Sequence, residues 1–309
     1  MKKTIKVFAP ATVANLGSGF DVMGMAIDGT GDELEVAVEE GEGLEIINKS
    51  AVELPSDIEK NVVTPAVRAL LAAYGRAVKV TVTVLHKILP GSGIGSSAAS
   101  SAGAVYGLNE LLDRPFGERA LVEFAMEGES LIGGGARHAD NVGPAIMGGV
   151  VLIRGYEPLD IVKLPVPDDF YTVVVHPHIT VTTKEGRGVL PREIPLHTAI
   201  TQWGNVGGLV AGLALGDMGL VGRSIQDAVA EPARKHFIPG YDELKEALLA
   251  GGALAVNIAG SGPAVFAVCD TMTRAEQLGR LMTAHFAHLG IDADVYPSKI
   301  SGIGTRVID

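Results

Sequence analysis

The chain carries the stretch Pro90-Gly91-Ser92-Gly93-Ile94-Gly95-Ser96-Ser97-Ala98-Ala99-Ser100-Ser101. Its three glycines stand at alternate positions, and glycine lets a backbone turn sharply and approach a ligand closely. The serines and alanines that follow are able to start a helix, whose free N–H groups and dipole attract anions. Because the stretch lacks the lysine of the GxxxxGK[ST] nucleotide loop, it predicts a phosphate cradle built from backbone.

Two other interpretations of this glycine loop stay open from its residues alone. A dinucleotide-binding turn normally follows a strand that is buried on both faces and is continuously apolar. Residues 78–84 alternate apolar and polar instead, which disfavours that fold. The remaining interpretation is a helix cap that binds nothing, since short glycine motifs often occur without a ligand.

The bulk composition predicts a well-packed globular protein. The 309 residues are 47% hydrophobic and 20% charged, enough for one large domain or two ordinary ones. A net charge of −11 argues against nucleic acid as a partner. The only cysteine, Cys269, cannot form an intrachain disulfide, and the sequence has no apolar run of transmembrane length. We therefore expect a soluble, cytoplasmic protein with no membrane partner.

Hydrophobic periodicity predicts an α+β chain. Strands are expected over residues 4–9, 33–39, 78–84, 147–154, 170–176, 253–258, 264–268 and 292–296. Helices are expected over residues 61–75, 96–112, 118–132, 197–217, 241–250 and 273–289. Glycine and prolines cluster over residues 154–168, which indicates two domains, residues 1–160 and residues 161–309.

The glycine loop is one of three separated segments that carry a family resemblance. The other two are Ala9-Pro10-Ala11-Thr12-Val13-Ala14-Asn15-Leu16-Gly17-Ser18-Gly19-Phe20-Asp21 and Asn257-Ile258-Ala259-Gly260-Ser261-Gly262-Pro263-Ala264-Val265-Phe266. Together they resemble the GHMP kinases, the family of galactokinase, homoserine kinase, mevalonate kinase and phosphomevalonate kinase. The resemblance implies an N-terminal domain like ribosomal protein S5 domain 2, with a left-handed βαβ crossover, and a ferredoxin-like C-terminal domain. The active site would lie in the cleft between the two domains.

Within this family the chain resembles the members that act on L-homoserine. Two segments carry the finer resemblance, Val22-Met23-Gly24-Met25-Ala26-Ile27-Asp28 and His138-Ala139-Asp140-Asn141-Val142-Gly143-Pro144-Ala145. They imply transfer of the γ-phosphoryl group of ATP to the hydroxyl of L-homoserine, in threonine biosynthesis, by a homodimer. The alternatives are another small-molecule GHMP kinase, for example with a mevalonate-type substrate, and a non-catalytic sensor on the same fold.

The resemblance also assigns the nucleotide site. The residues expected to wrap the triphosphate are Leu89, Pro90, Gly91, Ser92, Gly93, Ile94, Gly95, Ser96, Ser97, Ala98 and Ala99. Mg²⁺ binds carboxylate and phosphate oxygens, so we expect Ser97 and one glutamate to hold it. The glutamate is Glu129 or Glu127, of which we favour Glu129, and Ser97 also has the simpler interpretation of a helix N-cap.

Homoserine carries an ammonium, a carboxylate and a hydroxyl, and the resemblance supplies a partner for each. Asp21 is expected to bind the ammonium, and Arg187 and Arg234 the carboxylate, because a guanidinium offers paired donors. Asn15 and His138 are expected to line the same pocket. Arg192 is the alternative to Arg187. Arg187 is favoured because the family's arginine stands shortly before a Leu-Pro pair, as Arg187 does here.

Asn141 stands where related kinases with a catalytic base carry aspartate. An amide cannot take a proton at neutral pH but is able to orient the substrate hydroxyl. We therefore expect no side-chain base, with Asn141, Ser97 and Glu129 carrying the catalysis through positioning and charge. Asp140 is the alternative base, and we expect it to face away from the substrate and brace its loop.

Two histidines are considered as ligands of a second metal ion. His176 and His178 are two residues apart on an expected strand, so both side chains would project from one face. Because the sequence shows no third ligand beside them, a metal role is disfavoured.

Overall fold

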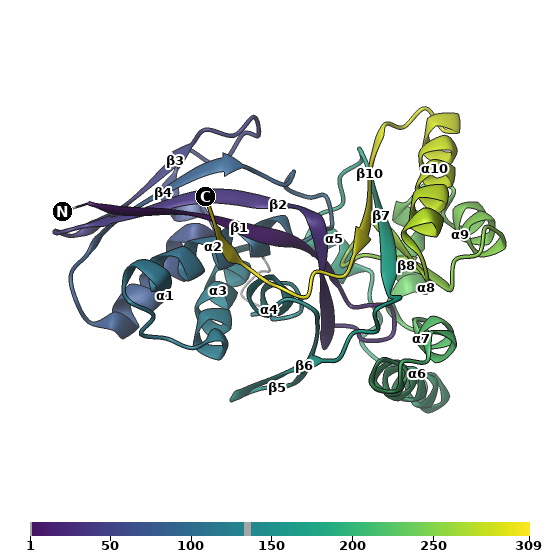
Figure 1. Ribbon diagram of the computed structural model, residues 1–309. Coiled ribbons are helices and arrows are strands. Elements are labelled where there is room, and N and C mark those ends of the chain that lie inside the picture. Colours follow the sequence, from purple (N-terminus) through teal and green to yellow (C-terminus); the bar gives the residue numbers. More distant parts are fainter. Residues whose placement is uncertain (1, 133–136) are drawn as a thin grey trace.

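A computed structural model describes residues 2–132 and 137–309 of the chain. It contains a seven-stranded and a four-stranded sheet, which lie side by side in Figure 1. The first sheet is built from β1 (Lys3–Ala14), β2 (Met23–Glu39), β3 (Gly43–Asn48), β4 (Lys79–His86), β5 (Val150–Tyr156), β6 (Leu159–Leu164) and β11 (Arg306–Ile308). Its order is β11-β1-β2-β4-β3, with β5 pairing β2 and β6 pairing β5.

Four helices cover one face of the first sheet (Figure 1). They are α1 (Val63–Tyr74), α2 (Ser96–Leu111), α3 (Glu118–Ile132) and α4 (Val142–Met147). Thirteen of the residues of α2 are buried, because this helix lies between the sheet and its neighbours and consists largely of alanine, serine and glycine. Small side chains let the helix approach the sheet closely, which fixes the glycine loop at its start.

The second sheet has the order β10 (Ala293–Lys299), β7 (Tyr171–Pro177), β9 (Val265–Cys269) and β8 (Ala255–Ile258), and all its pairs are antiparallel. One face packs against α9 (Tyr241–Ala250) and α10 (Met272–His288). The other face contributes Val174, Phe266 and Val268 to a core shared with Val13 and Met25 of the first sheet. This shared core holds the two sheets in a fixed relation.

The remaining α-helices lie between β7 and β8 of the second sheet in the sequence. They are α5 (Thr183–Gly188), α6 (Leu196–Leu215), α7 (Met218–Ser224) and α8 (Ala230–Arg234), with two short 3₁₀ turns at Ile58–Lys60 and Lys235–Phe237. A capping box of Thr182 and Glu185 starts α5. Among the described residues, no helix has the length and apolarity needed to cross a lipid bilayer.

The α+β class expected from the periodicity is confirmed, and each expected strand and helix overlaps an observed one. The sequence analysis did not expect β3, β6, β11 or the short helices α4, α5, α7 and α8. The proposed division at residue 160 falls within β6, and β11 returns from the second half of the chain to pair with β1. β3 and β4 are parallel and joined through α1, and the left hand of that crossover stays a prediction.

Candidate active site

The three resemblance segments meet between the two sheets. The Asn15 side-chain amide donates a hydrogen bond to the backbone carbonyl of Gly260 at 2.9 Å, and the Gly260 N–H donates to the carbonyl of Ala14 at 3.3 Å. A Cβ atom added to Gly93 would lie 2.9 Å from the carbonyl oxygen of Gly262, so the two glycine turns pack directly. Segments more than 150 residues apart therefore form one site.

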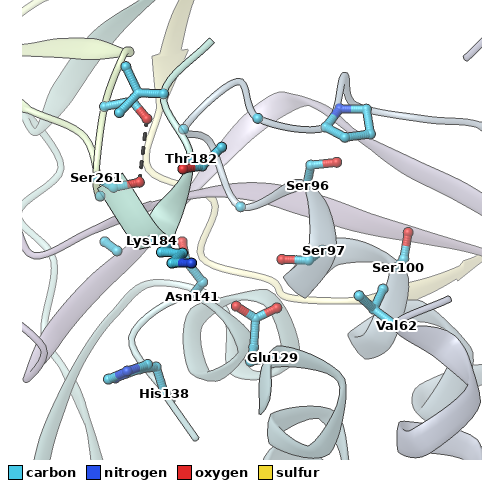
Figure 2. Close-up of a pocket in the computed structure, with 18 of the residues that line it drawn as sticks. Val62, Ser96, Ser97, Ser100, Glu129, His138, Asn141, Thr182, Lys184 and Ser261 are labelled. Atoms are coloured by element: carbon cyan, nitrogen blue, oxygen red, sulfur yellow. Dashed lines mark hydrogen bonds between the residues drawn. The ribbon is translucent and has the colours of Figure 1, made fainter. Parts of the chain in front are cut away.

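A cleft of about 430 Å³ opens at this meeting point. Figure 2 shows Glu129 and Ser97 near its middle, with Ser100 and Val62 on one side and Asn141 and His138 on the other. Its lining includes several residues that the sequence analysis did not assign: Leu54, Pro55, Lys60, Asn61, Val62, Lys87, Thr180, Val181, Thr182 and Lys184. The glycine loop and both arginines, Arg187 and Arg234, therefore line one cleft.

The alternating glycines are required by the backbone of the loop. Gly91, Gly93 and Gly95 have φ angles of 79°, 82° and 73°, in the left-handed region that favours glycine. A Cβ on Gly95 would also lie 1.9 Å from the Thr12 hydroxyl. Gly95 is the N-cap of α2, and no side chain caps this helix, which leaves its first N–H groups to face the cleft. The alternative interpretation of Ser97 as the helix N-cap is therefore wrong, and its expected role at Mg²⁺ stays a prediction.

Six of the eleven residues expected around the triphosphate line the cleft, namely Pro90, Gly91, Gly93, Gly95, Ser96 and Ser97. The side chains of Ile94, Ala98 and Ala99 are buried in the hydrophobic cores and anchor the loop. Ser92 is also buried, and Leu89 is exposed outside the lining. Contact with a triphosphate through the backbone of these five residues stays a prediction.

A buried lysine lies beneath the loop, at a place where sequence reasoning expected none. The Lys87 ammonium lies 3.0 Å from the Asp32 carboxylate and donates to the backbone carbonyl of Ser96 at 2.7 Å. The Ser100 hydroxyl donates a hydrogen bond to the same Asp32 carboxylate at 2.6 Å. Burial lowers the pKa of Lys87, an effect that the Asp32 charge opposes. A lysine directly after a strand and just before a glycine loop is the sequence signal that was overlooked.

The structure separates the two candidate glutamates. Glu129 is buried and lines the cleft next to Ser97, and its Oε1 atom has no hydrogen-bond partner among the described residues. Burial raises the pKa of the Glu129 carboxyl to about 7, although the Ser97 hydroxyl and the Lys87 ammonium oppose the rise. Glu127 instead pairs with Arg137 at 2.8 Å on the partly exposed side of α3.

Asp21 and Arg187 form a bidentate ion pair in the cleft. Two guanidinium nitrogens of Arg187 lie 2.8 and 3.2 Å from the two Asp21 carboxylate oxygens. His138 lies 3.8 Å from the same carboxylate, and burial lowers the pKa of its imidazole. Arg192 is exposed and is not among the residues that line the cleft, so the geometry favours Arg187 over it.

Arg234 fixes the neighbouring wall. Its buried guanidinium donates to the backbone carbonyls of Gly186 and Gly260, each at 2.8 Å. The guanidinium carbons of Arg234 and Arg187 lie 5.1 and 5.9 Å from the centre of the Phe20 ring. Burial and the Arg187 charge lower the pKa of Arg234. Two cations are therefore held close together beside one carboxylate.

Asn141 and Asp140 precede α4 and both line the cleft. The Thr12 hydroxyl donates to the Asn141 amide oxygen at 2.8 Å, which leaves the amide N–H groups as donors. Asp140 is buried, and the expectation that its side chain faces away from the substrate and braces its loop stays a prediction. Burial raises the pKa of the Asp140 carboxyl to about 7, and the charges of Asp21 and Glu129 add to the rise.

Sequence models of the GHMP kinase N-terminal and C-terminal domains match residues 61–149 and 209–288 of the chain. Homoserine kinase of Chlorobaculum tepidum is 43% identical over 99% of this chain and 98% of its own length. The chain belongs to the GHMP kinase family.

Solved structures agree with this membership. A homoserine kinase from Cytophaga hutchinsonii superposes on this GHMP kinase with a TM-score of 0.94 at 47% identity, covering 100% of this chain and 98% of that one. The mevalonate kinase of L. major in complex with R-mevalonate, at 16% identity and TM-score 0.71, covers 97% of this chain and 96% of that one. At that identity the likeness extends to the fold alone.

Proposed function

We propose that this GHMP kinase transfers the γ-phosphoryl group of ATP to the side-chain hydroxyl of L-homoserine, as a step in amino-acid biosynthesis. The substrate is inferred from the Asp21–Arg187 ion pair in the cleft, with Arg234 beside it. A zwitterionic amino acid offers one cation and one anion, which are the complements of these charges. Full-length similarity to homoserine kinases supports the same substrate.

The substrate roles follow from these charges. Asp21 would bind the ammonium of homoserine, while Arg187 and Arg234 would bind its carboxylate. Asn15 holds the wall in place, because its amide oxygen accepts from the Asp21 backbone N–H at 3.0 Å while its amide nitrogen donates to Gly260. His138 borders the same charges. Galactose and mevalonate have no ammonium to satisfy Asp21, so they are disfavoured.

We further propose that Ser97 and Glu129 hold Mg²⁺. The unpartnered Oε1 atom of Glu129 beside a hydroxyl fits a hard cation that takes oxygen ligands. Mg²⁺ would neutralise charge on the β- and γ-phosphates during transfer. The first N–H groups of α2 and the glycine loop would hold the same phosphates through hydrogen bonds.

No side-chain base is proposed for the transfer. The Asn141 amide, oriented by Thr12, would donate to the substrate hydroxyl oxygen and align it. Asp140 lies in the same cleft with a pKa near neutrality, so it needs a direct test. In Asp140→Asn we expect kcat to stay within about tenfold of wild type. A kcat loss of several orders of magnitude, with homoserine binding intact by calorimetry, would overturn the proposal.

The substrate is tested by ADP release with ATP and Mg²⁺ against L-homoserine, D-homoserine, mevalonate, galactose and L-threonine. Turnover with L-homoserine alone is expected. Asp21→Asn should then raise KM for homoserine and leave the KM for ATP near its wild-type value, since only the ammonium partner is lost. Turnover with a different alcohol would refute the substrate, and ATP binding without any turnover would favour a sensor.

We also propose a homodimer, joined through α6. The apolar residues Leu196, Ile200 and Trp203 on this peripheral helix are 68%, 57% and 65% exposed (Figure 1). The stripe continues at the same 4-3 spacing through Gly207, Val210 and Ala214. In an antiparallel pair about a twofold axis, Trp203 faces Gly207, Ile200 faces Val210 and Leu196 faces Ala214. Larger side chains then meet smaller ones, which makes the face complementary to itself.

The dimer is tested by sedimentation of Trp203→Glu, which we expect to halve the mass of the particle. Leu215→Glu is the matched control, because Leu215 is 77% exposed on the same helix but off the stripe. Loss of the dimer in both variants, or in neither, would contradict the proposed face.

We place the enzyme in the cytoplasm, since its single cysteine cannot form an intrachain disulfide.

A further inference from the structure

The second sheet brings a third potential ligand to the two histidines that sequence reasoning left without one. In the β7–β10 pair, Asp294 stands directly opposite His176. His178 follows the end of β7, and its backbone N–H donates to the carbonyl of Asp292 at 2.7 Å. Figure 1 shows β7 and β10 side by side at the edge of the sheet. Strand pairing thus joins residues more than 110 positions apart.

The ligand atoms of the three side chains lie close enough to share one ion. His178 Nε2 is 2.9 Å and His176 Nδ1 is 3.9 Å from the same carboxylate oxygen of Asp294. All three ligand atoms lie within 4.8 Å of one another. Ligands at the usual 2.0–2.2 Å from a tetrahedral ion are about 3.4 Å apart, a value between the two distances to Asp294. Small side-chain rotations therefore suffice to surround an ion.

The donor set selects a class of metal. Two imidazoles and one carboxylate suit Zn²⁺ and its neighbours in the first transition row, whereas Mg²⁺ and Ca²⁺ take oxygen ligands. The His176 side chain is 3% exposed, while those of His178 and Asp294 are 44% and 51% exposed. Solvent can therefore reach the site and supply a further ligand. Burial, with the nearby His178, lowers the pKa of His176, which keeps its imidazole in the neutral, ligating form.

We propose that His176, His178 and Asp294 form a binding site for a divalent transition-metal ion of the Zn²⁺ type, separate from the phosphoryl-transfer centre. The site would tie the edge strand β10 to β7 at the point where β7 ends. Thr180, Val181 and Thr182, which follow at once, line the cleft. Metal binding would thus brace the start of the segment that leads into α5 and Arg187.

The test uses tag-free protein, so that added histidines do not bind the probe. Co²⁺ is titrated in the presence of millimolar Mg²⁺, which competes for oxygen-only sites, and the visible absorption of protein-bound Co²⁺ is followed. We expect one Co²⁺ per chain, displaced by Zn²⁺, and a higher midpoint of thermal unfolding with Zn²⁺ bound. The absorption band should vanish in His178→Ala and in Asp294→Asn.

Two controls separate this site from others. His288→Ala removes an exposed histidine at the end of α10, and Glu129→Gln removes the proposed Mg²⁺ ligand; both should keep the Co²⁺ band. Failure of wild type to bind Co²⁺ in a saturable way would overturn the proposal, leaving a His178–Asp294 ion pair alone. A band that survives in Asp294→Asn, or one that disappears in Glu129→Gln, would overturn it as well.

Discussion

Two buried carboxyl groups, Glu129 and Asp140, have pKa values of about 7 in the cleft. Burial is the main cause in both, and each carboxylate is disfavoured in its charged form until a cation approaches. Of these two carboxyl groups, Glu129 is the one with a buried oxygen that lacks a hydrogen-bond partner among the described residues, and this oxygen lies beside a hydroxyl. This difference makes it the better ligand for a metal ion.

Glu129→Gln should lower kcat/KM by about 100- to 1000-fold, because the charge that holds Mg²⁺ against the phosphates is lost. The variant should also need a higher Mg²⁺ concentration for half-maximal rate. Initial rates at several fixed Mg²⁺ concentrations measure both effects. Glu127→Gln is the matched control, since Glu127 lies two residues away and pairs with Arg137 outside the cleft. Equal losses in the two variants would contradict the assignment of the metal ligand.

Motifs in the sequence predicted which residues would lie together, while the roles of these residues stay predictions. Asp21, His138, Asn141, Arg187 and Arg234 were all expected in one pocket, and all line the cleft. The burial of Asp140 was not predicted, because burial depends on packing that no motif states. The partners of Lys87 and His176 were missed for a related reason. Their partners, Asp32 and Asp294, lie far away in sequence and arrive only through strand pairing.

Among the elements, the loop before α2 depends most on local backbone chemistry. Its glycines adopt φ angles that other residues rarely tolerate, and its hydrophobic members are buried on either side. The Ile94 carbonyl accepts from the Thr12 N–H at 3.1 Å, which attaches the loop to β1. The first N–H groups of α2 are therefore fixed in place before any phosphate binds, and little ordering remains to be done on binding.

Gly95→Ala should weaken ATP binding by about tenfold or more, equivalent to about 1.4 kcal/mol. The new Cβ would lie 1.9 Å from the Thr12 hydroxyl, and the residue would be strained at a φ of 73°. Gly91→Ala is the control, because its φ is 79° but the nearest atom to its Cβ is 3.7 Å away, on Thr180. Calorimetric titration with an ATP analogue compares the two. Equal losses would mean that φ strain alone matters, and that the Thr12 contact does not.

The long elements were predicted more completely than the short ones. The long helices α2, α6 and α10 were each predicted from a stretch of more than ten residues, whereas five-residue α8 is too short to display a period. The partners of each strand could not be predicted either, because strands such as β11 pair with strands that are distant in sequence. Sequence therefore predicted most elements and the class of the fold, while the pairing came from the structure.

For the whole molecule, the shared core between the sheets determines how the cleft responds to its ligands. Residues of the first motif, such as Val13 and Leu16, pack in one cluster with Phe266 of the third motif. The walls of the cleft are thus backed by continuous hydrophobic packing, which has low compressibility and keeps the charges at fixed distances. The energetic cost of holding those charges should appear in the stability of the whole protein.

Stability without nucleotide should fall as the pH rises from 5 to 8. The pKa values of Glu129 and Asp140 are raised to about 7 in the folded protein, from about 4 when unfolded. The folded state therefore binds more protons between these values, and the stabilisation present at pH 4 is lost as the pH passes 7. We expect a loss of at least ~1 kcal/mol per group.

The lowered pKa values of His138 and His176 act in the opposite direction between pH 5 and 7, so a comparison with a variant is needed to isolate the carboxyl groups. The midpoint of thermal unfolding of Glu129→Gln/Asp140→Asn should fall less steeply with pH than that of wild type. Mg²⁺–ATP should raise the wild-type midpoint more at pH 8 than at pH 6, because it favours ionised Glu129. Parallel pH curves for wild type and variant would show that neither carboxyl group has a raised pKa.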